Sequence, residues 1–377
     1  MKILITTASY YPHLDGVQKV TQYQAEGLVK LGHEVTVITS DRQGQYSKKE
    51  VHNGVKIIRV NAYNKNMQHF GDKRGFQNLV KQLASNVDVM MNVSLESFAA
   101  DWVLPIMDSI PCRKVLMNHG MHDFVWNKQN ISSGKEFVKK ILRDVRWELF
   151  YQSNWKKICK YDEVIFLHEQ DYAYKYFAKR EYPNRHVIYN AVDPEFFLAA
   201  SELKQNNIIN VGTYNKRKNQ LECLKAFYKA DTKDYSLTLI GNPDNEYYRM
   251  LIEESGKLSQ KYGSKKVEIL CNVSRQETVE RICASKIYLM TSTWEAFPIS
   301  LIESMAAGNA YISTNVGIVK YLPGGKICEE ENELVQSISS LIDGKWSQLA
   351  EKGHEYAVKN FSQIDQVKKL EEVLMSN

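Results

Sequence analysis

The sequence predicts an α/β protein built from two tandem Rossmann-like domains. The chain has 377 residues, which is longer than one ordinary domain, and 44% of them are hydrophobic while 25% are charged, as in globular proteins. Its apolar, β-branched runs are short, and the segments between them are long enough for crossover helices. The runs form two series, which meet near the polar stretch at 201–207.

The first series begins with a predicted βαβ unit. An apolar run at 3–9 is followed by the turn-rich YPHLDG, a helical segment at 17–31 and the strand EVTVITS. Further predicted strands lie at 55–60, 87–93, 114–117 and 163–167. The crossover segments between them imply a mainly parallel sheet, and we assign residues 1–200 to this first domain.

The second series repeats the alternation of strands and helices. Its predicted strands lie at 208–212, 236–241, 267–270, 287–291 and 310–314, with helices near 221–230, near 246–262 and from about 299. We assign residues 201–361 to this second domain, and expect 362–377 to form a helix that packs back toward the first. Ligands of doubly wound sheets bind beyond the carboxyl ends of the strands, so we expect a ligand-binding cleft between the two domains.

The start of the chain and its cysteines indicate a cytoplasmic protein. The segment MKILITTASYYPHLDG has one basic residue before a short apolar run and lacks a small-residue cleavage pattern, and the chain has no run of about 18 apolar residues. The cysteines are scattered without a C-x-x-C pair, which argues against a zinc knuckle or a disulfide framework. The formal net charge of +5 is small for a nucleic-acid binder, so we expect no nucleic acid partner.

One segment concentrates this positive charge. Between 133 and 160 there are eight basic and three acidic residues, an excess of five that equals the net charge of the whole chain. Six apolar residues interleave with them: Leu142, Val145, Trp147, Leu149, Phe150 and Trp155. Two interpretations stay open. The segment either rests on an anionic membrane surface, or packs its apolar residues on the first domain while its lysines remain solvated.

The most specific motif is TWEAFPISLIESMAAG at 293–308. Pro298 suits the first turn of a helix, which would leave the N–H groups of Ile299, Ser300 and Leu301 unpaired and aimed at an anion such as a diphosphate. Glu303 would then lie one turn inside, able to accept hydrogen bonds from ribose hydroxyls. Glu295 would lie in the loop before the helix. The alternative is that both are ordinary solvated acids, because acids gather in first helical turns.

At these residues the chain resembles the retaining glycosyltransferases of the GT-B fold, of the group 1, family 4-like type that includes enzymes of bacterial surface polysaccharides. The resemblance covers nearly the whole chain. Besides the glutamate motif, the segments that carry it are YYPHLDGVQKVTQYQAEGLVKLGHEVTVIT, NHG (118–120), YNAVDPEFF (189–197) and VGTYNKRKNQ (211–220). It implies transfer of a hexose or N-acetylhexosamine from a nucleotide sugar to a saccharide or polyprenyl-linked acceptor.

The resemblance also implies roles for single residues. Lys218 would pair with the diphosphate, Glu295 would contact the donor sugar, and His119 would act from the first domain near the transferred sugar. Gly16 would let the first loop approach a ligand closely. The resemblance places the remaining donor contacts at Gly212, Thr213, Arg217 and Phe297, with Pro298, Ile299, Ser300 and Glu303 from the helix start.

Three departures from the family pattern weaken single inferences. Thr213 stands where an arginine is common, Asp15 replaces the first glycine of a pair, and Ala191 replaces a glycine after Asn190. We expect no metal or other cofactor, because cationic groups can replace Mg²⁺ at the diphosphate. UDP is the favoured nucleotide and GDP the next. An epimerase or a phosphorylase fits the motifs less well, and the main alternative is a non-catalytic subunit that stabilises a partner enzyme.

Overall fold

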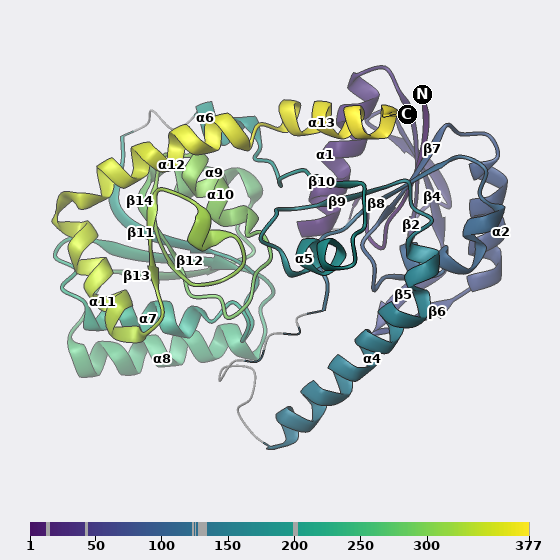
Figure 1. Ribbon diagram of the computed structural model, residues 1–377. Helices are drawn as coiled ribbons and strands as arrows, with labels where there is room; N and C mark the ends of the chain where they lie inside the picture. Colours follow the sequence, from purple (N-terminus) through teal and green to yellow (C-terminus); the bar gives the residue numbers. More distant parts are fainter. Residues whose placement is uncertain are drawn as a thin grey trace. The chain divides into compact units, whose positions relative to one another are not determined.

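The computed structural model describes residues 1–12, 16–41, 44–122, 124, 126, 134–198 and 203–376. The chain forms two compact units, unit 1 with Met1–Tyr189 and Gln363–Asn377, and unit 2 with Asn190–Ser362 (Figure 1). Unit 2 therefore begins earlier than the predicted boundary at 200/201, which itself lies outside the described residues. The chain passes between the units twice, and Val192 and Ser362 form a parallel bridge within unit 2 at these passages.

An eight-stranded sheet forms the centre of the described part of unit 1, in the order β10-β9-β8-β7-β1-β2-β4-β3. Its strands are β1 (Lys2–Thr6), β2 (Glu34–Ser40), β3 (Lys49–His52), β4 (Val55–Val60), β7 (Val89–Val93), β8 (Arg113–Met117), β9 (Glu163–Phe166) and β10 (Arg185–Val187). All neighbours pair in parallel except β3 and β4. The predicted mainly parallel sheet is confirmed.

Two hairpins in unit 1 were not predicted. β3 and β4 are joined at Asn53 and Gly54, whose φ angles are +49° and +82°. The small sheet of β5 (Ala62–Lys65) and β6 (Gln68–Gly71) turns at Asn66 and Met67, again with two positive φ angles. Two-residue turns of this kind match the twist of antiparallel strands, and Asn-Gly favours them strongly.

The helices of unit 1 cover both faces of its sheet. They are α1 (Gly16–Lys30), α2 (Lys73–Ala84), α3 (Phe98–Asp101), α4 (Gly134–Ile158), α5 (Tyr172–Lys179) and α13 (Gln363–Met375), with a 3₁₀ helix η1 (Leu104–Ser109). α13 packs against α1 so closely that a Cβ at Gly27 would lie 2.7 Å from Val367. α2, α4 and α5 contribute fully buried rings to the core, among them Phe76, Tyr151 and Phe177.

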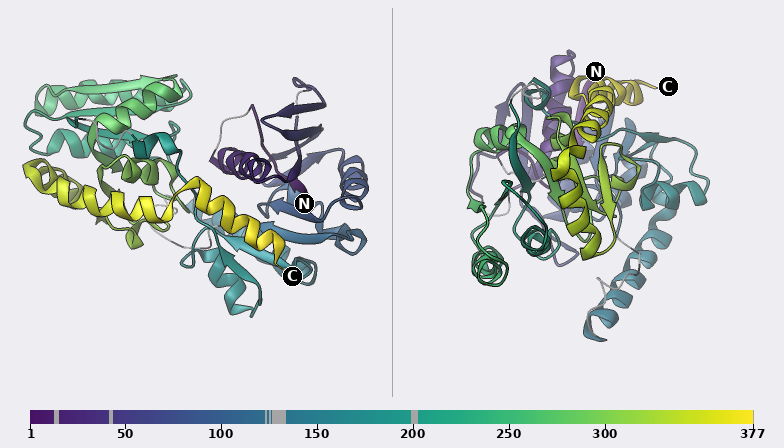
Figure 2. Two further views of the ribbon diagram at one scale, coloured as in Figure 1. Left: turned by 90° about the horizontal axis from the view of Figure 1, so that it is seen from above. Right: turned by 90° about the vertical axis from the view of Figure 1, so that its left-hand side faces the viewer.

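Helix α4 has two contrasting halves. Toward its C-terminus Trp147 and Tyr151 are buried, and Phe150 and Trp155 pack against the core of unit 1. Its N-terminal half projects away from the sheet of unit 1 (Figures 1 and 2) and leaves apolar side chains exposed: Phe137, Val138, Ile141, Leu142 and Val145. No helix in the described part of the chain combines the length and apolar character needed to cross a bilayer.

Unit 2 repeats the doubly wound design with a sheet that, in its described residues, has the order β13-β12-β11-β14-β15-β16, parallel throughout. Its strands are β11 (Gln205–Val211), β12 (Ser236–Gly241), β13 (Val267–Cys271), β14 (Ser285–Met290), β15 (Ala310–Thr314) and β16 (Gly325–Cys328). Its helices are α6 (Pro194–Leu198), α7 (Gln220–Lys229), α8 (Glu246–Tyr262), α9 (Arg275–Ala284), α10 (Ile299–Ala306), α11 (Glu331–Ser340) and α12 (Trp346–Asn360), with the short turns η4 (Val319–Tyr321) and η5 (Leu341–Lys345). Helices α7 and α8 lie on one face of the sheet and α9, α10 and α12 on the other (Figure 1). The expectation of two Rossmann-like domains is therefore confirmed.

Candidate functional site

The strand order of unit 2 changes direction beside β11. β12 and β13 lie on one side of this strand, and β14, β15 and β16 lie on the other. The loops that follow β11 and β14 therefore leave the carboxyl edge of the sheet side by side, which is where ligands of doubly wound sheets bind. These loops are 212–219 and 291–298, and they contain most of the residues that the sequence singled out.

An ion pair joins the two loops. The Lys218 ammonium lies 2.7 Å from Oε1 of Glu295, and the two side chains are 16% and 9% exposed. The backbone reinforces the junction, because the N–H of Thr293 donates to the carbonyl of Arg217 at 2.8 Å. The Lys218 side chain passes beside Gly212, where an added Cβ would lie 3.4 Å from its Cδ, at van der Waals contact. The structure thus brings two predicted site residues into direct contact.

The backbone of Gly317 packs against the loop that contains Glu295. Its φ is +52°, and a Cβ there would lie 2.3 Å from the carbonyl oxygens of Glu295 and Ala296. The adjacent N–H of Ile318 donates to the Ala296 carbonyl at 3.2 Å. Because only glycine fits both the backbone angle and this close approach, Gly317 fixes the position from which Glu295 reaches Lys218.

Helix α10 begins at Ile299, as predicted, but Pro298 does not belong to its first turn. Pro298 is the N-cap, with φ −72° and ψ 108°, instead of a residue of the first turn, because its extended ψ keeps it outside the helix. Ile302 donates its N–H to the Pro298 carbonyl, whereas no described residue accepts from the backbone N–H of Ile299, Ser300 or Leu301. The predicted cluster of outward N–H donors at this terminus is therefore present, and it suits an anion.

Glu303 lies in α10 and is only 3% exposed. Its carboxylate is held by Arg275, whose Nη2 lies 2.6 Å from Oε1. The interpretation of Glu303 as an ordinary solvated acid is wrong, since the side chain is buried and paired. Arg275 itself was missed, because nothing in the local sequence marks an arginine after Ser274 as part of a site.

The other predicted donor residues differ in their surroundings. Thr213 is exposed, and the guanidinium of Arg217 lies 5.6 Å from the centre of the Trp294 ring. Phe297 is buried and meets Phe361 edge-to-face with ring centres 5.8 Å apart, so its ring belongs to the interior. Ser300 accepts a hydrogen bond from the Tyr288 hydroxyl at 2.6 Å, which ties the start of α10 to β14.

In unit 1 the strand order changes direction beside β1, which lies between β2 and β7. Gly16 is the first residue of α1 and is exposed, while Asp15 lies outside the described residues. His119 follows β8, is half-buried and precedes Gly120, whose φ is +116°. No described contact brings Gly16 and His119 together.

The loop after β7 carries a carboxylate that the sequence analysis did not single out. Ser94 and Glu96 adopt φ angles of +62° and +65°, which is uncommon for residues other than glycine. Oε1 of Glu96 accepts hydrogen bonds from the Tyr151 hydroxyl at 2.6 Å and from the N–H of His122 at 2.5 Å. Burial raises the pKa of Glu96 to about 7, although these two hydrogen bonds oppose the shift.

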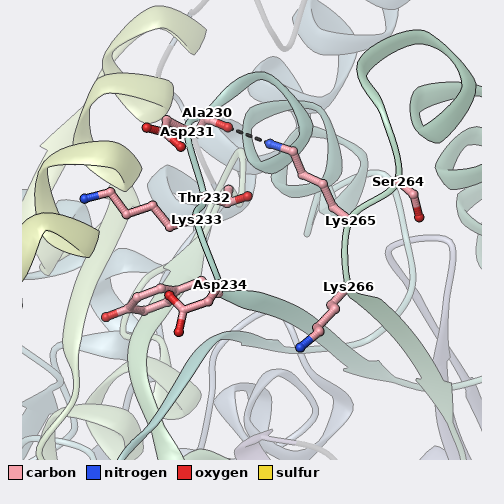
Figure 3. Close-up of a pocket in the computed structure, with 9 residues that line it drawn as sticks. Ala230, Asp231, Thr232, Lys233, Asp234, Ser264, Lys265 and Lys266 are labelled. Carbon is pink, nitrogen blue, oxygen red and sulfur yellow. Dashed lines mark hydrogen bonds between the residues drawn. The ribbon is translucent and has the colours of Figure 1, made fainter.

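Unit 2 also has a hollow that does not include the candidate site residues. It is lined by Ala230–Tyr235 and by Ser264–Lys266, and Lys265 donates to the carbonyl of Ala230 at 2.6 Å (Figure 3). These residues precede β12 and β13, so the hollow opens at the amino edge of the sheet. The predicted residues instead gather at the carboxyl edge.

Comparisons with known proteins agree with this fold. The family model described as "Glycosyltransferase Family 4" matches residues 14–196, and that described as "Glycosyl transferases group 1" matches 193–357. The Anabaena protein HepE, solved in complex with UDP and glucose, is 15% identical, is covered over 100% of both chains and superposes with a TM-score of 0.66, which shows the fold alone.

Two relatives come from Klebsiella pneumoniae. An uncharacterized 42.6 kDa protein in its cps region is 23% identical over 342 residues, which is 84% of this chain and 86% of the relative. An uncharacterized 41.2 kDa protein in the cps region is 23% identical over 197 residues, which is 48% of this chain, so this chain spans about half (52%) of that relative.

The fold and the two family models define a glycosyltransferase of the GT-B class. The two family models together cover both units, so the chain belongs to the glycosyltransferases of family 4 and group 1. The resemblance seen in the sequence is confirmed.

Proposed function

We propose that this glycosyltransferase transfers a hexose or N-acetylhexosamine, with retention of configuration, from a nucleotide sugar to a saccharide or lipid-linked saccharide in cell-surface glycan synthesis. The observation that carries the proposal is the carboxyl edge of unit 2, where the Lys218–Glu295 pair adjoins the free N–H groups that open α10. A UDP-sugar is the favoured donor, since HepE was solved with UDP and glucose. The relatives from the cps region fit a role in surface glycans.

The chemistry assigned to this edge is stabilisation of a leaving diphosphate. The bond between the anomeric carbon and the diphosphate oxygen breaks, and the acceptor hydroxyl oxygen bonds to the same face of that carbon. The hydroxyl proton passes to the departing diphosphate. Lys218 and the N-terminus of α10 offset the negative charge that develops, and Glu295 binds a donor hydroxyl. His119 remains the proposed catalytic residue of unit 1, and no protein nucleophile is invoked.

The proposal is tested by measuring release of nucleoside diphosphate from UDP- and GDP-sugars, followed by the anomeric configuration of any glycoside formed. We expect release from one UDP-sugar above the others and an axial or equatorial linkage that matches the donor. Release from no nucleotide sugar, or an inverted product, would contradict the proposal.

We also propose that the projecting half of α4 rests on an anionic membrane surface, where a lipid-linked acceptor would be found. Its exposed apolar residues include Phe137 (42% exposed), Val138 (54%) and Leu142 (64%). Lys135 and Lys139 are exposed on the same half, which suits the boundary between headgroups and acyl chains. The packing interpretation holds for Trp147, Phe150 and Trp155, so each of the two sequence interpretations describes one half of the helix.

Lys140 does not belong to this surface. It is 2% exposed and pairs with Asp144 at 2.6 Å, so its charge is used within unit 1. The test therefore compares Lys135→Glu/Lys139→Glu with Lys156→Glu at the other end of α4. Sedimentation with vesicles that contain anionic lipid should fall for the first variant and at high salt, and stay unchanged for the second. Equal sedimentation with neutral vesicles, or none at all, would exclude the membrane proposal.

A further inference from the structure

Three carboxylates of unit 2 share one guanidinium. Nη2 of Arg275 lies 2.6 Å from Oε1 of Glu303 and 2.7 Å from Oδ2 of Asp193, and its Nε lies 3.8 Å from Glu195. The guanidinium also lies over the ring of Phe196, 5.0 Å from its centre. One side chain at the start of α9 therefore connects α10 with α6 and the residue before it.

The position of this guanidinium is fixed from several sides. Ser274 caps α9 by accepting the N–H of Glu277 at 3.1 Å, which sets where Arg275 leaves the helix. Phe196 is fully buried, so the ring under the guanidinium is held by the packing around it. Burial alone would lower the pKa of Arg275, but Glu303 and Asp193 outweigh it and raise the pKa above its usual value. The group stays charged.

Glu303 is the most buried of the three carboxylates that contact Arg275. Its side chain is 4% exposed and it lies one turn into α10, whose N-terminus is the proposed diphosphate site. A buried carboxylate without a cation is costly and would also repel an anionic ligand. Arg275 donates to both oxygens of Glu303, at 2.6 Å to Oε1 and at 3.5 Å to Oε2, and so fixes the plane of the carboxylate, which has about four acceptor positions in all.

We propose that Arg275 is a positioning residue of the nucleotide site, which orients the Glu303 carboxylate toward the two hydroxyls of the ribose. Asp193 in turn holds Arg275, which gives a role to the YNAVDPEFF segment. The inference rests on the proposed function, since it requires a nucleotide at the start of α10.

The experiment measures affinity by calorimetry for UDP and for 2′,3′-dideoxy-UDP, with GDP and its dideoxy form as the second pair. The variants are Arg275→Gln, Arg275→Lys and Asp193→Asn. The matched control is Arg281→Gln, because Arg281 lies on the same helix and pairs with the exposed Glu277 and Glu268. Thermal unfolding of each variant checks that the fold is retained.

We expect the wild type to prefer the ribonucleotide, and Arg275→Gln to weaken ribonucleotide binding about tenfold while dideoxynucleotide affinity changes less than about twofold. Arg275→Lys and Asp193→Asn should give smaller losses in the same direction, and Arg281→Gln none. A purely structural role would weaken both nucleotides equally, and that result overturns the inference.

Two further outcomes are distinguishable. If the wild type binds ribo- and dideoxynucleotide equally, Glu303 does not read the ribose and the inference fails while the proposed function stands. If the wild type binds neither UDP nor GDP, both the proposed function and the inference are wrong.

Discussion

Both units have buried acidic side chains after the strand that pairs with the central strand at which the sheet order changes direction. The partners of these carboxylates differ between the two units. In unit 2 the buried Glu295 and Glu303 each face a cation, Lys218 and Arg275. In unit 1 Glu96 is bound by a tyrosine hydroxyl and a backbone N–H, which are neutral.

The surroundings of the buried carboxylates in unit 1 shift their pKa values. Burial raises the pKa of Glu96 to about 7 because its neutral partners only partly oppose the shift. Burial likewise raises the pKa of Asp101 in unit 1, against the opposing bond to His69 at 2.8 Å. The partners of Glu96 and Asp101 reduce the effect of burial on the pKa but do not cancel it, whereas unit 2 places a lysine and an arginine beside its buried carboxylates.

Removing a cation from unit 2 should have the largest effect. Lys218→Ala deletes the ammonium at the proposed leaving group and leaves the buried Glu295 without its partner. We expect kcat for sugar transfer to fall by about 10²–10³-fold. Lys216→Ala, two residues away and exposed, is the control and should stay within about twofold. A loss of the same size in both variants would mean that the basic run acts only through its total charge.

Truncating the second acid of unit 2 should weaken ligand binding more than it affects the fold. Glu303→Ala removes a charge-assisted acceptor, so nucleotide affinity should drop by about 1.5–3 kcal/mol. Calorimetry with UDP or GDP measures this, and Glu253→Ala on the exposed face of α8 provides the comparison. Unchanged affinity would remove Glu303 from the site.

The neutral surroundings of Glu96 predict a pH effect on stability. Its pKa rises from 4.5 to about 7 on folding, so the folded state binds the proton more tightly between these values. The stabilisation is complete below pH 4.5 and is lost as the pH rises through about 7. Relative to Glu96→Gln, the wild type should lose about 1–3 kcal/mol of unfolding free energy between pH 5 and pH 8.

Urea unfolding at a series of pH values checks this prediction. Tyr151→Phe removes one hydrogen bond that lowers the pKa of Glu96, so the transition should move to higher pH in that variant. Parallel curves for the wild type and Glu96→Gln would show that Glu96 does not titrate in this range.

Chelation should have the smallest effect. Since Lys218 and the start of α10 are the proposed partners of the diphosphate, transfer activity in excess EDTA should stay within about twofold of the untreated enzyme. Complete loss that Mg²⁺ or Mn²⁺ restores would show that a cation does what we assign to these groups.

The sequence predicts much of the fold because the central strands are buried and form short, continuous apolar runs. It also predicts Glu295, Glu303 and Lys218, whose loops follow strands at the edge where ligands bind. Three features escape it for physical reasons. Arg275 reaches Glu303 only through tertiary packing, and Glu96 gains its character from a left-handed backbone and from Tyr151, which is distant in sequence. The Asn53–Gly54 dipeptide favours a hairpin, but β3 has only four residues and none of them is buried, so it lacks the apolar run that marks the other strands.

Helix α13 has a consequence for how the polypeptide is made. The side of α1 that α13 packs on includes Gly27, where an added Cβ would lie 2.7 Å from Val367. Along the chain, the residues of unit 2 (Asn190–Ser362) separate α1 from α13. During translation the ribosome must therefore synthesise Asn190–Ser362 before α1 can meet its partner, so a nascent unit 1 keeps one flank uncovered while unit 2 emerges and folds.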